Sequence, residues 1–484
     1  MLYSSLLHNF FFPASLVLTR SRCFELYKQM LGLEERPREE VDALRWERFK
    51  QLLEHAYENV PYYRKVMEEQ DLKPSDIAKV EELARLPVLT KAKVQRNFPD
   101  RITAQNIPST DWRYVSTRGT ANRLISVQDF RKRDMVRATE LRSAHLSGDY
   151  RVGKVWAEIP PDVCSIVCGD ENEPDEGVFR YGWELIRKRK FFDSRSISNL
   201  RGLIERKWLY RRITYPPFGA DGTNIGSDRI GEYVSKLRKD KPFLLKALPT
   251  YAYKLAQYVV DKGLPPIPVT AVKPMGGSVS NVMRDKIAQA FTGAYREDYG
   301  SSEFGSIACD CSIGSGLHIF SDCFLIEITN DGVAVEDGQL GKILITDLSN
   351  FAMPMIRYEI GDIGYIDSSL CECGRTSPRL WVEGRVEDAI ELADGSLLSN
   401  DKIMDFFYQR PEIDQFQLIQ RAPSEFELLV VPQPDHEPGA NGLVAELKEL
   451  LGHPQAVDLR VVASVAPETS GKFRFVKAYR GSVH

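Results

Sequence analysis

The sequence lacks an excess of positive charge and any hydrophobic run long enough to cross a bilayer. Its 484 residues carry 64 Lys and Arg against 68 Asp and Glu, a formal net charge of −4. Proteins that bind nucleic acid usually present a strongly basic surface, so a nucleic-acid partner is not expected. Hydrophobic residues make up 43% of the chain and charged residues 27%, which is typical of a folded protein with a core.

A secretion signal is not expected either. The N-terminal segment "MLYSSLLHNFFFPASLVLTR" is apolar, but it has no early Lys or Arg, is interrupted by His8, Asn9 and Pro13, and falls short of a full span. We expect a helix packed on the body of the protein, with a membrane-surface anchor as the alternative, and no integral membrane segment. The expected compartment is cytoplasmic, where the eight cysteines would be thiols or metal ligands rather than disulfides.

Hydrophobic periodicity predicts an α/β architecture for the larger part of the chain. Apolar residues between Phe49 and Val60 fall on one helical stripe, which must end before Pro61. A second helix is predicted over "YAYKLAQYVVDKG", with Gly263 as its C-cap. Short apolar runs such as "GKVWAEI" and "PVTAVKPMGG" alternate with helices, as in a layered α/β fold. A chain of this length is expected to form two or three domains.

The pattern changes to strands further along the chain. "CFLIEIT", a turn at residues 330–332 and "GKILITDL" predict antiparallel strands of a β-rich subregion. Residues 389–484 form a separate, small α+β unit in this interpretation, with strands at "FQLIQ", "FELLVV" and "VDLRVVASV" and a helix at "GLVAELKELLG". The charged join at residues 386–388 is a candidate hinge between this unit and an N-terminal part of residues 1–385.

Two polar segments carry residue types that suit a nucleotide. In "YVSTRGTANRLIS", Ser116, Thr117, Gly119 and Thr120 resemble a phosphate-cradling loop, although Arg118 interrupts it and an ordinary polar turn is the alternative. The second segment, "REDYGSSEFGS", covers residues 296–306.

In "REDYGSSEFGS" an aromatic residue, small residues and a carboxylate follow one another. Tyr299 can flank a flat base, and Gly300, Ser301 and Ser302 let backbone approach a phosphate. The Glu303 carboxylate can hold Mg²⁺. For this segment alone, a polar loop that caps a helix is the simpler interpretation.

Two further segments present single charged residues. Gly361 and Gly364 bracket Asp362, whose carboxylate could accept hydrogen bonds from the two hydroxyls of a ribose, or could belong to a simple β-turn. Lys472 in "PETSGKFRFVK" follows Ser and Gly without the complete GxxxxGK[ST] pattern of a Walker loop. On a mobile domain Lys472 would be a movable cation for a developing phosphoryl charge, and a surface turn is the alternative.

The cysteines indicate a metal site. Cys311 is followed by His318 seven residues later, and Cys371 and Cys373 form a second C-x-C pair after the strands. Three thiolates and one imidazole suit the closed, tetrahedral geometry of structural Zn²⁺, with Cys309 as a spare thiol. Scattered free thiols are the alternative. Such a site would clamp loops together and perform no chemistry.

Taken in order, these segments resemble one family. The chain is similar to the adenylate-forming enzymes of the phenylacetate–CoA ligase branch, especially the members found in capsular polysaccharide biosynthesis. The resemblance rests on "HAYENVPYYR", "YGSSEFGSIACDC", "LITDLSNFAMPMIRYEIGDIG", "CECGRTSPRL", "EGRVEDAI" and "SGKFRFVK", and it runs from about residue 45 to the end. It implies a large N-terminal adenylation domain and a mobile C-terminal domain that carries the catalytic lysine.

The resemblance also implies roles for the residues. Tyr299 would border the adenine, Glu303 would approach Mg²⁺, Asp362 would hold the ribose, and Arg385 would contact the nucleotide near the hinge. Lys472 would bridge the carboxylate substrate and the α-phosphate of ATP. The expected products of this step are an acyl-AMP and pyrophosphate.

A swing of the small domain about Glu387 and Asp388 would then withdraw Lys472 and admit CoA or an amine as the acceptor. The identity of the small carboxylate stays open. So does the oligomeric state, for which a dimer is one option.

The sequence departs from the family pattern at the phosphate loop. Aligned on Leu124, Arg118 and Ala121 replace two glycines and Arg123 replaces a proline. If those glycines adopt positive φ, each replacement costs about 1–2 kcal/mol, although an arginine could also bind the β- and γ-phosphates. The leading hypothesis is an active ligase. The alternatives are a catalytically weak relative that binds a partner, and a zinc-dependent hydrolase, which a full set of four zinc ligands disfavours.

Overall fold

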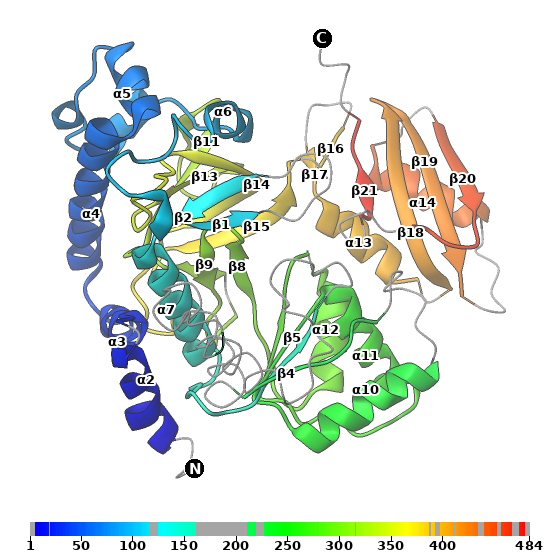
Figure 1. Ribbon diagram of the computed structural model, residues 1–484. Coiled ribbons are helices and arrows are strands. Elements are labelled where there is room, and N and C mark those ends of the chain that lie inside the picture. The colour runs from blue at the N-terminus through cyan, green and yellow to red at the C-terminus, as the bar shows by residue number, and fades with distance from the viewer. Residues whose placement is uncertain are drawn as a thin grey trace. The chain divides into compact units, whose positions relative to one another are not determined.

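The structure is a computed structural model, and Figure 1 shows its helices and strands. It describes residues 5–18, 20–116, 124–160, 187, 211–218, 227–277, 279–314, 316–386, 389–392, 397–410, 412–433, 440–452, 456–466 and 474–479. Contacts divide the chain into two compact units. Unit 1 comprises residues 1–31, 137–277 and 286–297, and unit 2 comprises residues 32–136, 278–285 and 298–484.

Unit 1 is built on a five-stranded parallel sheet in the order β4-β3-β5-β6-β7. Its strands are β3 Trp156–Ile159, β4 Arg212–Thr214, β5 Leu244–Ala247, β6 Ala271–Pro274 and β7 Ala294–Tyr295. Its helices are η1 Leu7–Phe11, α2 Phe12–Leu18, α3 Cys23–Leu33 as far as residue 31, the later turns of α7 Phe130–Leu146, α10 Ser227–Asp240, α11 Pro249–Asp261 and the end of α12 Asn281–Ala290. Parallel sheets need cover on both faces, and the strand residues of β5 and β6 are accordingly almost all buried.

The helix predicted over residues 251–263 is α11. Leu255, Ala256 and Val259 on one side of it pack into the core with strand residues Leu245 and Val272. The helix ends where Gly263 adopts φ +58°, and the Gly263 amide donates to the Val260 carbonyl. Glycine is the residue that takes this left-handed conformation without steric cost, so it terminates the helix as expected.

Unit 2 contains an eight-stranded antiparallel sheet in the order β12-β11-β13-β14-β15-β10-β9-β8. The strands are β8 Asp298–Ser301, β9 Gly305–Cys309, β10 Leu317–Ile319, β11 Phe324–Asn330, β12 Val333–Ala334, β13 Gly341–Asp347, β14 Tyr358–Asp367 and β15 Arg379–Arg385. The strands predicted at "CFLIEIT" and "GKILITDL" are β11 and β13, which pair antiparallel as expected. The expected mixed α/β fold class with a β-rich subregion is therefore confirmed.

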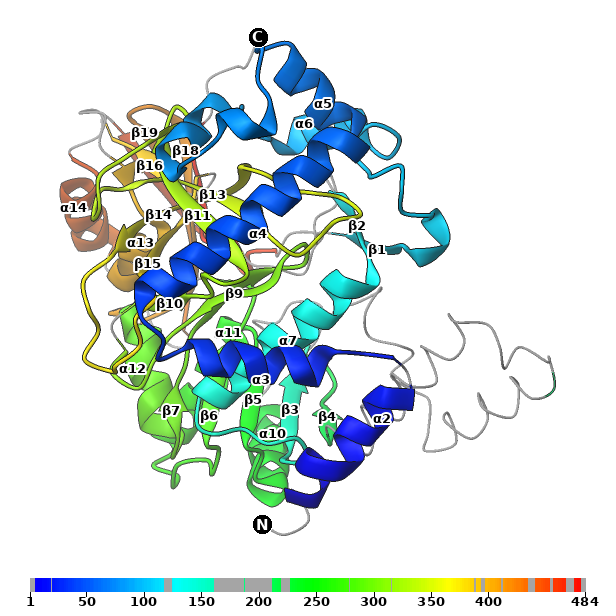
Figure 2. The same cartoon turned by 90° about the vertical axis from the view of Figure 1, so that its left-hand side faces the viewer.

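The N-terminal helices of unit 2 hold two of the sequence motifs together. They are α4 Arg38–Asn59, α5 Pro61–Glu68, the 3₁₀ turns η2 Pro74–Asp76, η3 Val80–Arg85 and η4 Ser109–Asp111, and α6 Lys91–Asn97, and Figure 2 shows α4 in front of the sheet. The buried Tyr63 hydroxyl donates to the Pro354 carbonyl at 2.9 Å and accepts from the Ile356 amide at 3.0 Å. "HAYENVPYYR" thereby packs on "AMPMIRY", although the two motifs are far apart in sequence.

The C-terminal segment has its own small sheet, in the order β20-β19-β18-β21. Its elements are β18 Ile413–Ala422, β19 Glu425–Pro432, β20 Ala456–Val461, β21 Val476–Lys477 and α14 Ala440–Leu450, preceded by β16 Ile390–Glu391, β17 Leu397–Leu398 and α13 Asn400–Tyr408. The strands β18, β19 and β20 and the helix α14 are the ones predicted from the sequence, whereas β16, β17, β21 and α13 were not predicted. The expected boundary at residues 386–388 differs from the contact-based division and stays a prediction, because Glu387 and Asp388 lie outside the described residues.

Among the described residues, none of the helices has the length and apolar character needed to span a membrane. The N-terminal segment forms η1 and α2, and its residues Leu7, Phe12 and Leu16 are buried, as expected for a helix packed on the protein.

Candidate functional site

Three predicted nucleotide residues meet in unit 2. The Tyr299 hydroxyl donates to Asp362 Oδ2 at 2.7 Å, and Arg385 Nε lies 2.9 Å from Asp362 Oδ1. Asp362 is almost fully buried, whereas the Arg385 side chain is 52% exposed. Burial around the hydroxyl, and then the Asp362 carboxylate, raise the pKa of Tyr299 well above its ordinary value. Tyr299 is therefore a neutral hydrogen-bond donor, and the Asp362 carboxylate lies between this donor and the Arg385 guanidinium.

The contact between Tyr299 and Asp362 requires a strongly curved sheet. Tyr299 lies on the edge strand β8 and Asp362 on β14, four strand spacings apart in the sheet. In a flat sheet these strands would be about 19 Å apart. Curvature of the antiparallel sheet thus brings together two side chains that neither sequence spacing nor strand pairing makes neighbours.

Glycines next to these residues are required by the backbone. Gly361 has φ +90°, which ordinary residues rarely adopt, and the following residue Asp362 pairs with Arg385 of β15. At Gly300 a Cβ atom would lie 2.3 Å from the Gly305 carbonyl oxygen, so β8 and β9 approach each other too closely for any side chain. The glycine pattern noted in the sequence reflects these two local requirements.

Glu303 lies in the turn between β8 and β9 and is almost fully buried. Its carboxylate is close enough to Tyr299 to contribute to the raised pKa of that hydroxyl. In the same turn Ser301 Oγ accepts from the Phe304 amide at 3.4 Å, while Gly300 and Ser302 are exposed. The turn therefore gathers small, accessible residues and one enclosed acid beside the Tyr299–Asp362 pair.

Two residues outside this turn, neither of which was predicted from the sequence, donate hydrogen bonds to its backbone carbonyls. Gln128 Nε2 donates to the Glu303 carbonyl at 3.1 Å, and Lys132 Nζ donates to the Phe304 carbonyl at 2.9 Å. Lys132 also forms an ion pair with Asp347 at 2.7 Å. No sequence signal marked them, because Lys132 belongs to a helix rich in Arg and Lys, where exposure would be the ordinary expectation.

The candidate phosphate loop connects the strands of a two-stranded antiparallel sheet. These strands are β1 Arg113–Ser116 and β2 Ile125–Gln128, and Ser116 pairs with Ile125 across the base of the loop. The other loop candidates, Thr117, Gly119 and Thr120, and the substituted positions 118, 121 and 123 lie outside the described residues, as does Lys472. The hairpin also links the loop to Gln128, the last residue of β2, and so to the turn that contains Glu303.

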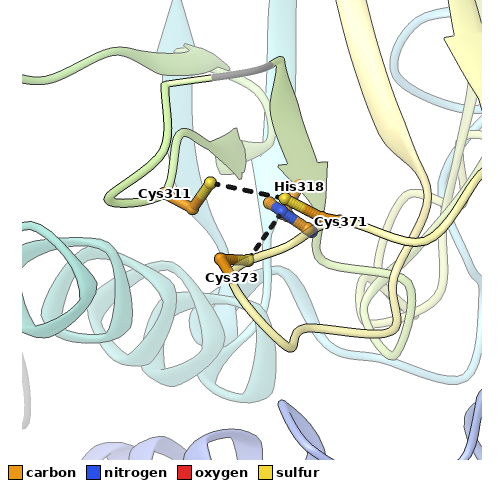
Figure 3. A group of neighbouring side chains, drawn as sticks. All are labelled: Cys311, His318, Cys371 and Cys373. Carbon is orange, nitrogen blue, oxygen red and sulfur yellow. Dashed lines mark hydrogen bonds between the residues drawn. The ribbon is translucent and has the colours of Figure 1, made fainter.

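The four predicted metal ligands come together at the end of β9, on β10 and in the loop between β14 and β15 (Figure 3). Their donor atoms all lie within 4.8 Å of one another, and only Cys373 is partly exposed. Cys311 Sγ and Cys371 Sγ are 3.8 Å apart, and Cys373 Sγ is 3.4 Å from His318 Nε2.

These distances fit a zinc ion. Tetrahedral Zn²⁺ with Zn–S of about 2.3 Å and Zn–N of about 2.0–2.1 Å places two sulfurs about 3.8 Å apart, and a sulfur and a nitrogen about 3.6 Å apart. His318 Nδ1 lies 3.1 Å from the Ser377 carbonyl, which fixes the ring with Nε2 toward the thiols. Four protein donors leave no open position for a reactive water, so the arrangement is of the closed, structural type.

The electrostatics of the cluster also fit a bound zinc ion. Burial, and then the charge of Arg375, lower the pKa of His318 to about 4, so the imidazole is neutral as a metal ligand must be. Burial and the neighbouring thiols raise the pKa of Cys373 to about 12. The Cys373 thiol therefore retains its proton when no cation is bound. Cys309, the spare thiol, lies instead 3.9 Å from Arg375, whose Nε pairs with Glu34 at 2.7 Å.

Known proteins resemble the chain in sequence and in fold. A family model described as the CapK C-terminal domain matches residues 390–479. The chain is 24% identical over 366 residues to a phenylacetate-coenzyme A ligase of Thermus thermophilus, covering 74% of this chain and 73% of that one. It is 21% identical over 333 residues to protein CapK of Staphylococcus aureus, covering 67% and 63%.

Among solved structures, a 2-hydroxyisobutyryl-CoA ligase in the postadenylation state matches with a TM-score of 0.68 at 21% identity, over 92% of this chain and 91% of that one. The fold is therefore that of the adenylate-forming CoA ligases. Together with the sequence relatives, it shows that the chain is a homologue of proteins named phenylacetate-coenzyme A ligase and protein CapK.

Proposed function

We propose that the protein is an AMP-forming acyl–CoA ligase, which activates a carboxylic acid with ATP and then transfers the acyl group to CoA. Relatives named phenylacetate-coenzyme A ligase support this activity. From the chain's own residues, the observation that carries the proposal is the linked group of Tyr299, Asp362 and Arg385 beside the enclosed Glu303. None of these findings favours the inactive alternative.

In the first step a carboxylate oxygen of the substrate attacks the α-phosphorus of ATP. The bond from that phosphorus to the bridging oxygen breaks, and pyrophosphate leaves with its electron pair. Asp362 would accept hydrogen bonds from the ribose hydroxyls, with Tyr299 and Arg385 orienting its carboxylate. Such a site accelerates the reaction by positioning and by neutralising charge rather than by proton transfer.

The phosphates would be bound by the hairpin loop that starts at Ser116, through Ser116, Thr117, Gly119 and Thr120. Lys472, on the C-terminal domain, would neutralise charge between the carboxylate and the α-phosphate. Glu303 suits a Mg²⁺ ion, because a carboxylate in an enclosed turn is the kind of ligand that Mg²⁺ takes from proteins. When bound, Mg²⁺ would offset negative charge on the phosphates.

In the second step the CoA sulfur attacks the acyl carbonyl carbon, AMP leaves, and the thiol proton passes to solvent. We propose that rotation of residues 389–484 about residues 386–388 separates the two steps by withdrawing Lys472. An amine acceptor, a role in polysaccharide biosynthesis, a cytoplasmic location and the oligomeric state all stay predictions.

The metal cluster belongs to the proposal as a structural Zn²⁺ site formed by Cys311, His318, Cys371 and Cys373. The fit of the donor distances to tetrahedral zinc supports it. The ion would join the loop before β15 to the strands β9 and β10, on the same sheet that carries Tyr299 and Asp362. Its expected contribution is to stability of that sheet and not to a chemical step.

The test is a screen of carboxylic acids with the purified full chain, ATP and Mg²⁺, read out as pyrophosphate release. With an accepted acid, hydroxylamine should trap the adenylate as a hydroxamate, and CoA should yield a thioester detectable by mass spectrometry. A protein that binds no nucleotide by calorimetry would refute the proposal. Thioester formation without a trappable adenylate would refute the two-step mechanism.

The role of Lys472 has a separate test. Lys472→Ala should abolish adenylation while leaving ATP binding by calorimetry nearly unchanged, because the lysine acts on the charge that develops during the step. Lys477→Ala is the matched control, since Lys477 lies on β21 of the same domain and bonds Gln417 at 3.0 Å. An unchanged adenylation rate in Lys472→Ala would contradict the assignment.

A further inference from the structure

The N-terminal segment has two apolar faces, only one of which packs on the protein. Leu7, Phe12 and Leu16 are buried, as described above. On the other face, four large apolar side chains are exposed to solvent, and they define the N-terminal apolar patch: Leu6 at 43%, Phe10 at 68%, Phe11 at 61% and Val17 at 78% exposure. Two adjacent phenylalanines that are both more than half exposed are costly in water, because neither ring is removed from solvent.

The segment that carries the patch packs on other residues of unit 1. The Val152 amide donates to His8 Nδ1 at 3.1 Å, and the His8 ring packs edge-on against Phe24 at 5.0 Å between ring centroids. Phe24 belongs to α3, which follows α2 in the chain (Figure 2). The segment is therefore docked through one face and presents the other as part of a defined surface.

Two basic residues lie near His8 of this segment. Arg151 and Lys28 lie close enough to His8 to add to the effect of burial, which lowers the pKa of His8 to about 4. Lys28 Nζ also lies 4.6 Å from the centre of the Phe24 ring. No Asp or Glu occurs before Glu25 in the sequence.

Among the described residues 20–28, which follow the segment, and 149–154, which lie beside His8, basic residues outnumber acidic ones. The basic residues are Arg20, Arg22, Lys28, Arg151 and Lys154, and the acidic residues are Glu25, paired with Arg22, and Asp149, which faces Arg151. An apolar surface with flanking positive charge matches the boundary of an anionic bilayer, where aromatic rings insert beside headgroups that attract Lys and Arg.

We propose that the N-terminal apolar patch, with its basic surroundings, docks the protein onto the surface of a membrane that contains anionic lipids. Phe10 and Phe11 insert at the level of the headgroups, and Arg20, Lys28 and Arg151 contact lipid phosphates. The bilayer is chosen over a second copy of this chain because the surrounding positive charges would repel their equivalents in a symmetric dimer. The segment lies on the bilayer and does not span it.

Vesicle flotation of the full chain tests this docking. The protein should float with phosphatidylglycerol-containing vesicles, stay at the bottom with pure phosphatidylcholine vesicles, and lose flotation at high salt. Phe10→Ser/Phe11→Ser should abolish flotation. Each neutralised basic residue should weaken binding roughly fivefold, so Arg20→Gln/Lys28→Gln should lower the partition coefficient more than tenfold.

The matched control is Val333→Ser, which removes a 63% exposed apolar side chain on β12 and should leave flotation unchanged. All variants should keep the thermal midpoint of the parent protein, because none of the substituted side chains is buried. Failure of the parent protein to float with anionic vesicles would overturn the proposal, as would undiminished flotation of Phe10→Ser/Phe11→Ser. Equal binding to neutral vesicles, or a dimer that the same double variant dissociates in light scattering, would overturn it too.

Discussion

The ammonium group of Lys132 lies 2.7 Å from the carboxylate of Asp347, and each side chain is only 1% exposed. The same nitrogen donates to the carbonyl of Phe304, the residue after Glu303. Asp347 in turn accepts hydrogen bonds from the amide and the hydroxyl of Ser349. A buried charge pair therefore fixes the turn that presents the proposed magnesium ligand.

Replacing Lys132 should affect both stability and adenylation. Lys132→Met leaves Asp347 as an unpaired buried charge, and we expect the free energy of unfolding to fall by about 3–5 kcal/mol in urea titrations. Adenylation should slow through kcat, since the turn at Glu303 loses its support. Lys132→Arg should restore part of the rate. The control is Lys65→Met, whose exposed pair with Glu69 should contribute less than about 1 kcal/mol. Full activity of folded Lys132→Met would contradict the positioning role.

The Asp362 carboxylate should be decisive for nucleotide binding. Asp362→Asn removes a charged acceptor that is worth about 1.5–3 kcal/mol, so the KM for ATP should rise roughly tenfold to a hundredfold. Tyr299→Phe should raise it less, because the carboxylate and Arg385 remain. Asp367→Asn, on the same strand, serves as the control. If Asp362→Asn keeps its fold by circular dichroism and its KM for ATP, the ribose assignment is wrong.

A pH-dependent contribution to stability should come from Glu140 in unit 1. Burial alone would raise its pKa, but Arg212 and Lys246 outweigh burial and lower it from 4.5 to about 2. A lowered folded-state pKa means that the stabilisation is present above pH 4.5 and is lost as the pH falls toward 2.

Glu140→Gln should therefore destabilise the protein at neutral pH by at most about 3 kcal/mol and make little difference near pH 2. Urea unfolding of both proteins across this range measures the effect. A difference between the two proteins that does not change with pH would show that Glu140 does not titrate as described.

The metal cluster predicts different outcomes for neighbouring cysteines. Freshly purified protein should contain about one equivalent of zinc by elemental analysis, as expected for one closed four-ligand site. Cys373→Ser should lose most of the metal and lower the thermal midpoint, because structural zinc contributes directly to folding. Cys309→Ser should retain the metal, since Cys309 lies outside the cluster and faces Arg375. Less than about half an equivalent in the parent protein, or equal loss in both variants, would contradict the assignment.

The metal ligands show that residue types and their spacing can predict a binding site. Cys311, His318, Cys371 and Cys373 were predicted as a set because paired cysteines in polar loops are uncommon without a metal, and the structure brings their donor atoms together. The helix that ends before Pro61 and the strands β11 and β13 were predictable for a similar reason. Proline, glycine and apolar periodicity act on the local backbone, so helices and strands can be predicted from them directly.

Lys132 and Gln128 show that residue types and spacing do not predict contacts between distant parts of the chain. Lys132 and the carbonyl that it binds are 172 residues apart, and nothing near Lys132 in the sequence indicates that it is buried. The same holds for the patch of Leu6, Phe10, Phe11 and Val17, because large apolar residues occur on more than one face of the segment and only packing decides which face stays exposed.

By itself the sequence determined the order of helices and strands, the likeness to adenylate-forming ligases and the identity of the candidate ligands, since these depend on residue type and short-range spacing. Only the tertiary structure decided which side chains meet. The Tyr299–Asp362 contact exists because the antiparallel sheet curves over several strands, a property of the whole sheet that no single segment encodes.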